Sequence, residues 1–291
     1  MAGHAACWRG VTTAPADVPA AARPPLSTRI RFGWLLEAGV VYGLYRAYSW
    51  ARGEMVASSR QALANARRLV DWQQHLYLDH ERTVQRWFLD DRWFIGFWNL
   101  WYGIAHYLVP VVTLVWLYRA DPVRYVRWRN TLLWMLPFAL LGFWLFPLTP
   151  PRLMPPGFGF VDTRLDYFNL GPSDKASLLG TNPYAAMPSL HVGWATACAI
   201  AVWPRLRHWW SRALVAAYPA AMLFCTVITA NHWFLDAAGS LVVLGLAYVL
   251  ASAPSWWRAR RSAARAQNDQ QVGVPVKSAS DSANTHDGRT R

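Results

Sequence analysis

The sequence predicts an all-α integral membrane protein with about six transmembrane helices packed as a bundle. Three observations lead to this fold class. Apolar segments of spanning length recur along the chain, and 54% of its residues are hydrophobic. Many of the 19 Trp residues lie at the edges of these segments, where aromatic rings anchor membrane proteins at the level of the lipid headgroups. The arginines are concentrated between the segments.

Six apolar segments have roughly the length that a helix needs to cross the hydrocarbon core of a bilayer. In chain order they are residues 33–50, 93–117, 131–148, 188–203, 213–230 and 234–252. The first and fourth segments are short, and flanking aromatic residues can extend them. A soluble helical bundle with an aromatic core is the alternative, and so many segments of spanning length argue against it.

The placement of the arginines predicts which side of the membrane each connection faces. The connections after the second and fourth segments, and the flank after the sixth, are rich in arginine, so the positive-inside rule places them in the cytoplasm. Both termini are then cytoplasmic, and the other connections face outward. We therefore expect a multi-pass protein of the plasma (cytoplasmic) membrane.

The two long outer connections differ in composition. Residues 51–92 mix acidic and basic side chains with apolar residues at helical spacing, which predicts one or two amphipathic helices along the outer interface. Residues 149–187 are rich in Pro, Gly, Asp and Asn, which is typical of an ordered loop. A loop of this length inside a compact domain is usually functional.

One membrane-embedded domain is predicted over residues 29–257. The Ala- and Pro-rich residues 1–28 and the residues 258–291, basic at first and then polar, are predicted to be disordered tails. The N-terminal stretch lacks the continuous apolar core of a cleavable signal peptide, so none is expected.

Charge and cysteine content exclude several other classes. The net charge of +13 does not indicate a nucleic-acid partner, because the arginines flank apolar segments, where anionic lipid headgroups attract them. The chain has three cysteines, Cys7, Cys198 and Cys225, and no CxxC motif, so neither a disulfide framework nor a zinc site is predicted. No cofactor is expected.

Three polar motifs fall at the outer ends of the predicted spans. They are Pro150-Pro151-Arg152 after the third span, Met187-Pro188-Ser189-Leu190-His191 at the start of the fourth, and Asn231-His232-Trp233-Phe234-Leu235-Asp236 at the start of the sixth. The predicted topology brings these distant motifs to the same membrane face. Their convergence predicts a functional site on the outer side.

The second and third motifs are suited to phosphate chemistry. Pro188 and Ser189 favour the start of a helix, so His191 falls in a first turn whose free N–H groups and positive dipole attract an anion. His232 and Asp236 are four residues apart on one helix face, so the carboxylate can accept one imidazole N–H and fix the tautomer. The other ring nitrogen is then free to attack phosphorus.

Simpler roles exist for several of these side chains. A lone interfacial histidine such as His191 is more often a hydrogen-bonded surface residue, and Asp236 could be an acid that the helix dipole favours. Arg152 offers the cation that a phosphoryl site requires, or a snorkelling anchor. Tyr102 and His106 could line the site, although a buried hydrogen-bonded pair is the favoured interpretation. Two histidines and one aspartate could also bind a metal, which suits the helix-start context less well.

The Pro-Ser-Leu-His motif at 188–191, followed by His-Trp-Phe-Leu-Asp at 232–236, resembles the type-2 phosphatidic acid phosphatase superfamily. Together with Pro150-Pro151-Arg152, the pattern looks most like the branch that contains inositol phosphorylceramide synthases, which are inositolphosphotransferases. The resemblance covers roughly residues 33–252. It implies a metal-independent mechanism through a phosphohistidine.

The resemblance also implies a role for each motif residue. His232 is the expected nucleophile, Asp236 orients it, and His191 protonates the leaving alcohol and later activates the acceptor. The substrate phosphate is expected to contact Arg152 and Ser189, with Pro188 beside them.

Several positions depart from the pattern of the superfamily. Leu145 stands in place of a lysine, Leu190 in place of the glycine of its PSGH motif, and Thr226 in place of an arginine six residues before the nucleophile. Because the changes at Leu145 and Thr226 remove cations, we expect Lys175 or a loop arginine such as Arg164 to help bind the phosphate.

We therefore expect an enzyme that acts on a phosphorylated lipid at the outer leaflet. The sequence leaves open whether it hydrolyses the lipid or transfers a phosphate-containing headgroup to an alcohol acceptor such as inositol. The rival hypothesis, from another class, is a membrane protein that binds or transports anionic lipid without chemistry.

Overall fold

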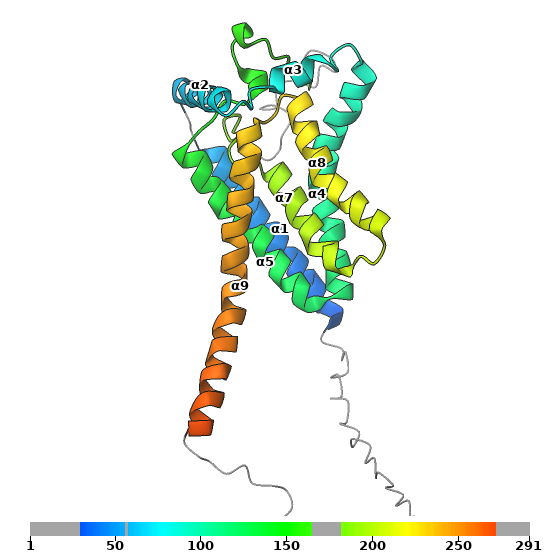
Figure 1. Ribbon diagram of the computed structural model, residues 1–291, viewed down its shortest axis with the longest axis vertical. Coiled ribbons are helices and arrows are strands. Elements are labelled where there is room, and N and C mark those ends of the chain that lie inside the picture. The colour runs from blue at the N-terminus through cyan, green and yellow to red at the C-terminus, as the bar shows by residue number, and fades with distance from the viewer. Residues whose placement is uncertain (1–29, 56–57, 165–181, 272–291) are drawn as a thin grey trace, which may run out of the picture. The chain divides into compact units, whose positions relative to one another are not determined.

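The structure, a computed structural model, describes residues 30–55, 58–164 and 182–271, and the side chains within 33–253 of these ranges. The described chain is helical and contains no strand, only an isolated bridge between Leu148 and Ala185. The prediction of an all-α protein is confirmed. The α-helices in Figure 1 are α1 (Ile30–Glu54), α2 (Ser59–His75), α3 (Glu81–Arg86), α4 (Arg92–Ala120), α5 (Pro122–Leu145), α7 (Leu190–Val202), α8 (Trp209–Ile228) and α9 (Phe234–Gln271).

The chain divides into two compact units, Met1–Tyr42 and Gly43–Arg291, with the boundary inside α1. All of the residues discussed below as a site belong to the second unit. Helix α9 continues past residue 257, where the predicted domain ends. The predicted tail at 1–28 and most of the predicted tail at 258–291 lie outside the described residues.

Three helices of the described chain are long and apolar enough to cross a membrane, namely α4, α8 and the Phe234–Ala253 part of α9. They coincide with the predicted spans at 93–117, 213–230 and 234–252. The other three predicted spans overlap α1, α5 and α7. Helix α7 has 13 residues, or about 20 Å of helix, against a hydrocarbon core of about 30 Å. The protein is therefore a multi-pass helical membrane protein, and six spans remain a prediction.

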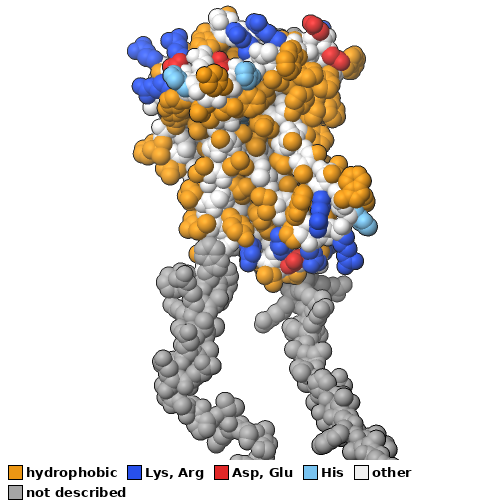
Figure 2. Space-filling view, in the orientation of Figure 1, with side chains coloured by type: hydrophobic (Ala, Val, Ile, Leu, Met, Phe, Trp, Pro, Cys, Tyr) orange, Lys and Arg blue, Asp and Glu red, His pale blue; other side chains and the backbone are white. Residues whose placement is uncertain are grey.

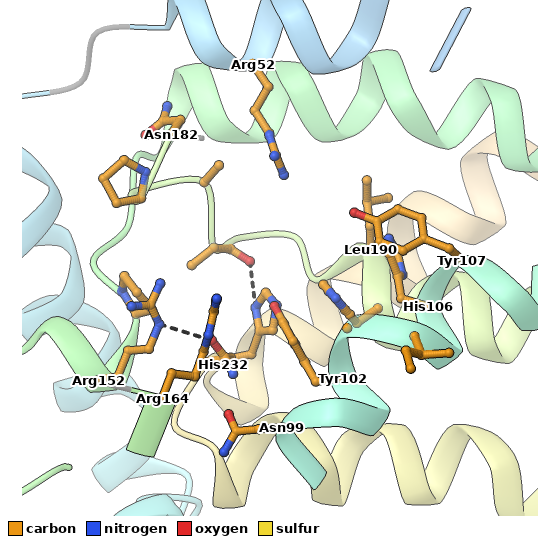
Figure 3. A pocket seen from close by; sticks show the side chains of 18 of the residues that line it. Arg52, Asn99, Tyr102, His106, Tyr107, Arg152, Arg164, Asn182, Leu190 and His232 are labelled. Carbon is orange, nitrogen blue, oxygen red and sulfur yellow. Dashed lines mark hydrogen bonds between the residues drawn. The ribbon is translucent and has the colours of Figure 1, made fainter. Parts of the chain in front are cut away.

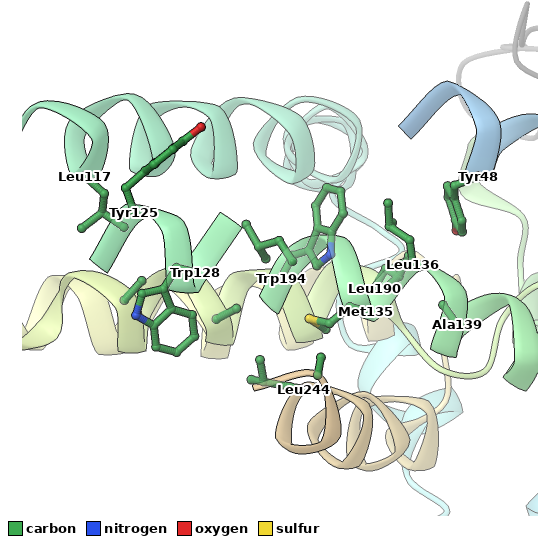
Figure 4. Packing of buried hydrophobic residues seen from close by; sticks show 14 of the residues in the cluster. Tyr48, Leu117, Tyr125, Trp128, Met135, Leu136, Ala139, Leu190, Trp194 and Leu244 are labelled. Carbon is green, nitrogen blue, oxygen red and sulfur yellow. The ribbon is translucent and has the colours of Figure 1, made fainter. Parts of the chain in front are cut away.

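Helices α5, α7 and α9 pack around a shared hydrophobic core (Figure 4). Met135 of α5 and Leu244 of α9 are buried there together with small side chains such as Ala197 of α7. A Cβ at Gly193 would lie 3.2 Å from Ser240 Cβ, so the glycine allows α7 and α9 to approach closely. This packing holds the start of α7 beside the start of α9.

The outer faces of the same helices are apolar as well. Val111 and Val112 of α4 and Val242 and Leu246 of α9 are all at least half exposed. Figure 2 shows hydrophobic side chains over the middle of the face in view and arginine side chains gathered toward its two ends. Soluble monomers rarely expose apolar surface on this scale, so these faces are suited to contact lipid.

Helices α2 and α3 occupy the connection that was predicted to hold one or two amphipathic helices, and they contact the start of α9. The fully buried Glu81 accepts hydrogen bonds at Oε1 from the backbone N–H of Phe234 (2.8 Å) and from Gln73 Nε2 (2.7 Å). Gln73 Oε1 accepts from the N–H of Leu235 (3.1 Å). Two N–H groups of the first turn, which lack partners inside their own helix, are thus satisfied from α2 and α3.

Burial raises the pKa of Glu81 above its ordinary value, although the hydrogen bonds from Phe234 and Gln73 oppose the increase. A raised pKa in the folded state favours the protonated carboxyl, so this contribution to stability is present in acid and is lost as the pH rises through the raised pKa. Glu81→Gln keeps a carbonyl oxygen for both donors but cannot ionise. We expect the free energy of unfolding of the wild type, measured relative to that of Glu81→Gln, to fall as the pH rises, by about 1.4 kcal/mol per pH unit at most.

The measurement is thermal unfolding of both proteins in detergent over a pH series from about 4 to about 8, which covers a glutamate pKa raised from its ordinary value. Parallel curves for the two proteins would contradict the prediction.

Candidate functional site

The three polar motifs meet around one cavity of about 630 Å³ in the second unit (Figure 3). The first motif follows α5 and forms a short 3₁₀ turn over Pro151–Leu153. The second leads into α7, and the third leads from the end of α8 into α9. Arg152, His191 and His232 all line the cavity, as the convergence of the motifs predicted.

His232 is held by two oxygen atoms at the same ring nitrogen. Its Nδ1 lies 3.1 Å from the carbonyl oxygen of Ala186 and 3.2 Å from Asp236 Oδ2. Both oxygens are acceptors, so Nδ1 carries the proton and the Nε2 of a neutral imidazole is unprotonated. Nε2 lies 3.5 Å from the hydroxyl of Tyr102, which also lines the cavity. The available lone pair of His232 is therefore on Nε2.

Asp236 is fully buried behind His232 and lies at the junction of two helix starts. Its Oδ2 also accepts a hydrogen bond from the backbone N–H of Trp233 (3.0 Å), and its carbonyl oxygen accepts one from the N–H of Ser189 (3.1 Å). The carboxylate thus orients the imidazole, and the backbone of the same residue connects the start of α9 to the start of α7.

The turn before α9 is anchored by the end of α8. The carbonyl oxygen of Thr226 accepts from the N–H groups of Asn231 (2.9 Å) and His232 (3.3 Å). The Thr226 side chain is fully buried and donates to the carbonyl of Leu223. The position where the superfamily pattern has an arginine therefore supplies a backbone acceptor that holds His232 in place.

His191 lies between two other rings. Its centroid is 3.9 Å from that of Tyr102 and 4.0 Å from that of His106, and both pairs are stacked. His106 stacks in turn on Trp194, and the rings of His191 and His232 are 5.5 Å apart between centroids. This stack fixes the His191 ring near His232.

The favoured interpretation of Tyr102 and His106 as a hydrogen-bonded pair is wrong. The two side chains flank His191 from opposite sides, and both line the cavity. His106 Nδ1 is buried and has no hydrogen-bond partner among the described residues. The i, i+4 spacing in α4 puts the two rings one turn apart, and the ring of His191 from α7 occupies the space between them.

Arg152 is positioned by polar groups on both sides. Its Nε donates to Asn231 Oδ1 (3.0 Å), and its Nη1 forms an ion pair with Asp162 Oδ2 (3.1 Å). Its backbone N–H donates to the carbonyl of Ala230. The guanidinium therefore lines the cavity with part of its charge compensated by Asp162.

The remaining predicted contact residues are placed differently from one another. Pro188 and Arg164 line the cavity. Ser189 is fully buried, is not among the lining residues, and its Oγ has no hydrogen-bond partner in the described part of the chain. Lys175 lies outside the described residues. Contacts of Ser189 and Lys175 with a phosphate remain predictions.

Several cavity residues were not predicted as part of the site. Arg52, near the end of α1, and Asn99 of α4 carry no motif signal, and the cavity wall includes both. Asn99 Nδ2 donates to Thr163 Oγ1 (3.0 Å), which connects α4 to the loop that carries Arg164. Within residues 30–55, 58–164 and 182–271, no cluster of three or more His, Cys, Asp or Glu side chains is arranged to hold a metal ion.

Gly142 of α5 packs closely against the segment that leads into α7 at the wall of the cavity. An added Cβ at Gly142 would lie 2.6 Å from Pro188 Cδ and 3.2 Å from the carbonyl oxygen of Met187. Neither atom is the end of a flexible side chain. We expect Gly142→Ala to destabilise the protein by about 1–3 kcal/mol because the segment that leads to His191 must shift.

The matched control is Gly245→Ala in α9, where an added Cβ meets no atom within 4 Å. The measurement is the thermal midpoint of both variants in detergent. If Gly142→Ala were as stable as Gly245→Ala, the proposed close contact would be ruled out.

Together, the fold and the cavity define a multi-pass helical membrane protein with two histidines, a buried aspartate and an arginine at one site. The chain belongs to the PAP2 superfamily, whose family model matches residues 67–250. This confirms the resemblance predicted from the motifs, and it supports a phosphatase or phosphotransferase enzyme.

The chain is also similar to the inositol phosphorylceramide synthase catalytic subunit aur1 of Schizosaccharomyces pombe, with 26% identity over 171 residues. The matched part is 52% of this chain and 38% of that protein, so the chain spans less than half of the length of this relative. No solved structure matches the chain.

Proposed function

We propose that this chain is an integral membrane enzyme that cleaves a phosphorylated lipid, or transfers its phosphate-containing headgroup, through a phosphohistidine on His232. The observation that supports this best is the environment of His232. Two acceptors hold the proton on Nδ1 and leave Nε2 as the nucleophilic atom, in a cavity that His191 and Arg152 also line.

The proposed reaction has two steps. In the first, His232 Nε2 attacks phosphorus, the bond from phosphorus to the ester oxygen breaks, and protonated His191 gives its proton to the leaving alcohol. In the second, neutral His191 takes a proton from water or an alcohol, whose oxygen attacks phosphorus, and the bond to Nε2 breaks. The carboxylate of Asp236 stabilises the positive charge that the imidazole carries in between, and Arg152 binds phosphate oxygens.

The walls of the cavity favour a lipid substrate. Leu100 and Ile104 of α4 line the cavity and are 62% and 50% exposed, so the apolar wall continues onto the apolar outer face of α4. Tyr107 and Phe143 also belong to the lining. A phospholipid can place its headgroup near His232 while its acyl chains remain on this apolar surface.

We place the site at the extracytoplasmic face of the plasma membrane. In this proposal six helices span the membrane, and the arginine-rich connections lie on the cytoplasmic side. These connections are residues 119–129, 205–212 and the segment from 258 onward. Both termini are then cytoplasmic. The three motifs fall at the opposite ends of the spans, and their meeting at one cavity is consistent with this topology.

Hydrolysis and transfer share the proposed intermediate and differ in whether water or an alcohol takes the phosphoryl group from His232. The name of the similar yeast protein makes inositol the first acceptor to test. The experiment supplies a panel of phospholipids and polyprenyl phosphates, each labelled in the phosphate, to the purified protein with and without inositol or glycerol. A labelled product that contains inositol phosphate and forms only when inositol is supplied would support the transferase, whereas free phosphate as the sole product would support the phosphatase.

The same reactions test the intermediate and the rival functions. A phosphoramidate on His232 should appear as label on the protein that is lost in acid and retained in alkali. A protein that binds or transports anionic lipid without chemistry would yield neither labelled product nor labelled protein. Full activity in a chelator would exclude a metallohydrolase.

A further inference from the structure

The proposed chemistry requires cations at the wall of the cavity, and the motifs of this chain supply fewer of them than the superfamily pattern does. Phosphoryl transfer depends on positive groups that stabilise the charge on the phosphate oxygens. Leu145 and Thr226 occupy positions where the superfamily pattern has a lysine and an arginine, and the Thr226 side chain is fully buried. Arg152 shares its charge with Asp162. Arg164 also lines the cavity, so Arg152 and Arg164 are two cations at its wall, and a further cation there would add to the stabilisation of the phosphate charge.

Arg52 is in a position to supply it. The residue lies near the end of α1, in the second unit and outside the range that the family model matches. Its side chain reaches from α1 into the cavity (Figure 3), from a different wall than Arg152 and Arg164. Its guanidinium carbon lies 5.8 Å from the centroid of the Tyr48 ring, which supports the side chain in this direction.

The Nε of Arg52 is buried and has no hydrogen-bond partner in the described part of the chain. A buried N–H of a charged group without an acceptor is unfavourable, so a ligand that brings an acceptor oxygen is favoured at this position. A guanidinium presents its N–H groups in a planar fork that matches the oxygens of a phosphate. Together with the proposed chemistry of the cavity, these properties favour a phosphate group as the ligand.

We propose that Arg52 binds the phosphate of the substrate, as a binding residue contributed by α1 that replaces the missing cations of the motif. This inference rests on the proposed function for the identity of the substrate. Binding of a phosphate anion at Arg52 can nevertheless be tested without turnover.

The test compares Arg52→Gln with Arg46→Gln, which removes an exposed arginine of the same helix. Calorimetric titration of the purified full-length proteins with inorganic phosphate should show binding about 10- to 100-fold weaker for Arg52→Gln and unchanged for Arg46→Gln. Arg52→Lys should be intermediate, because it retains the charge but loses the planar fork. Thermal midpoints without phosphate verify that each variant is folded.

Equal phosphate affinity in Arg52→Gln and Arg46→Gln would overturn the proposal. Because Arg52→Lys keeps the positive charge, it provides a second comparison if Arg52→Gln does not fold, and wild-type affinity in Arg52→Lys would then count against the fork geometry. With a lipid substrate, the KM of Arg52→Gln should rise by a similar factor.

A separate variant distinguishes this proposal from the proposed function. His232→Ala removes the nucleophile but leaves Arg52 unchanged, so it should still bind inorganic phosphate. If the wild type turned over no lipid but bound phosphate in a manner that depends on Arg52, the binding site would be supported and the enzyme refuted. Lipid turnover by the wild type, together with unchanged phosphate affinity in Arg52→Gln, would support the enzyme and refute the phosphate site at Arg52.

Discussion

His232→Gln is expected to lower turnover of a phosphorylated lipid by about 10⁴-fold or more, because it removes the atom that forms the covalent intermediate. Glutamine keeps a side-chain N–H for the buried carboxylate of Asp236, which would otherwise keep only the hydrogen bond from the backbone N–H of Trp233. The measurement is the rate of product release together with the amount of phosphate-labelled protein. Both should disappear while the thermal midpoint changes little.

The matched control for this experiment is His75→Gln, at an exposed histidine of α2. This variant should retain wild-type turnover and labelling. Wild-type turnover in His232→Gln would refute the proposed function, whatever the lipid is. Turnover that persists without labelled protein would refute the covalent intermediate alone.

Asp236→Asn is expected to lower kcat by about 10²- to 10³-fold with little change in KM. The asparagine oxygen can take the place of Oδ2 and still accept from Trp233 and His232. The carbonyl of Ala186 also keeps the proton on His232 Nδ1. The tautomer is therefore retained, and the loss reflects the negative charge that stabilises the cationic imidazole.

The control is Asp71→Asn, which neutralises an exposed aspartate of α2 and should leave kcat unchanged. A loss in Asp236→Asn as large as that in His232→Gln would show that the tautomer depends on Asp236 and that Ala186 does not hold the proton. The new amide nitrogen would occupy the place of Oδ1, which has no hydrogen-bond partner among the described residues. We therefore expect a stability loss of about 1–3 kcal/mol, which thermal unfolding can separate from the kinetic effect.

The helices could be predicted from the sequence because long apolar segments are stable only where they are removed from water. Each of the six predicted spans overlaps one α-helix, and three of these helices meet the length and apolarity of a membrane span. Helix ends were less predictable. Helix α5 begins at Pro122, nine residues before the predicted span, because a helix can continue beyond the apolar segment into water or headgroups.

Contacts in the site between residues that are close in the sequence could also be predicted. His232 and Asp236 contact each other because a spacing of four residues places two side chains on one helix face. Alternate crossings of the membrane, as predicted from the sequence, would bring the three motifs together, and residues of all three motifs do line one cavity. The catalytic roles of these residues remain predictions that the variants above test.

The sequence by itself determined the helical membrane class, the superfamily, and the residues that carry its motifs, because apolarity and short spacings act within a single segment. Only the tertiary structure decided the second acceptor at His232, the ring stack around His191, the support of α9 by Glu81, and the position of Arg52 at the cavity. Each of these contacts joins residues that are far apart in the chain. They depend on how the helices pack, and no local pattern of residues encodes that packing.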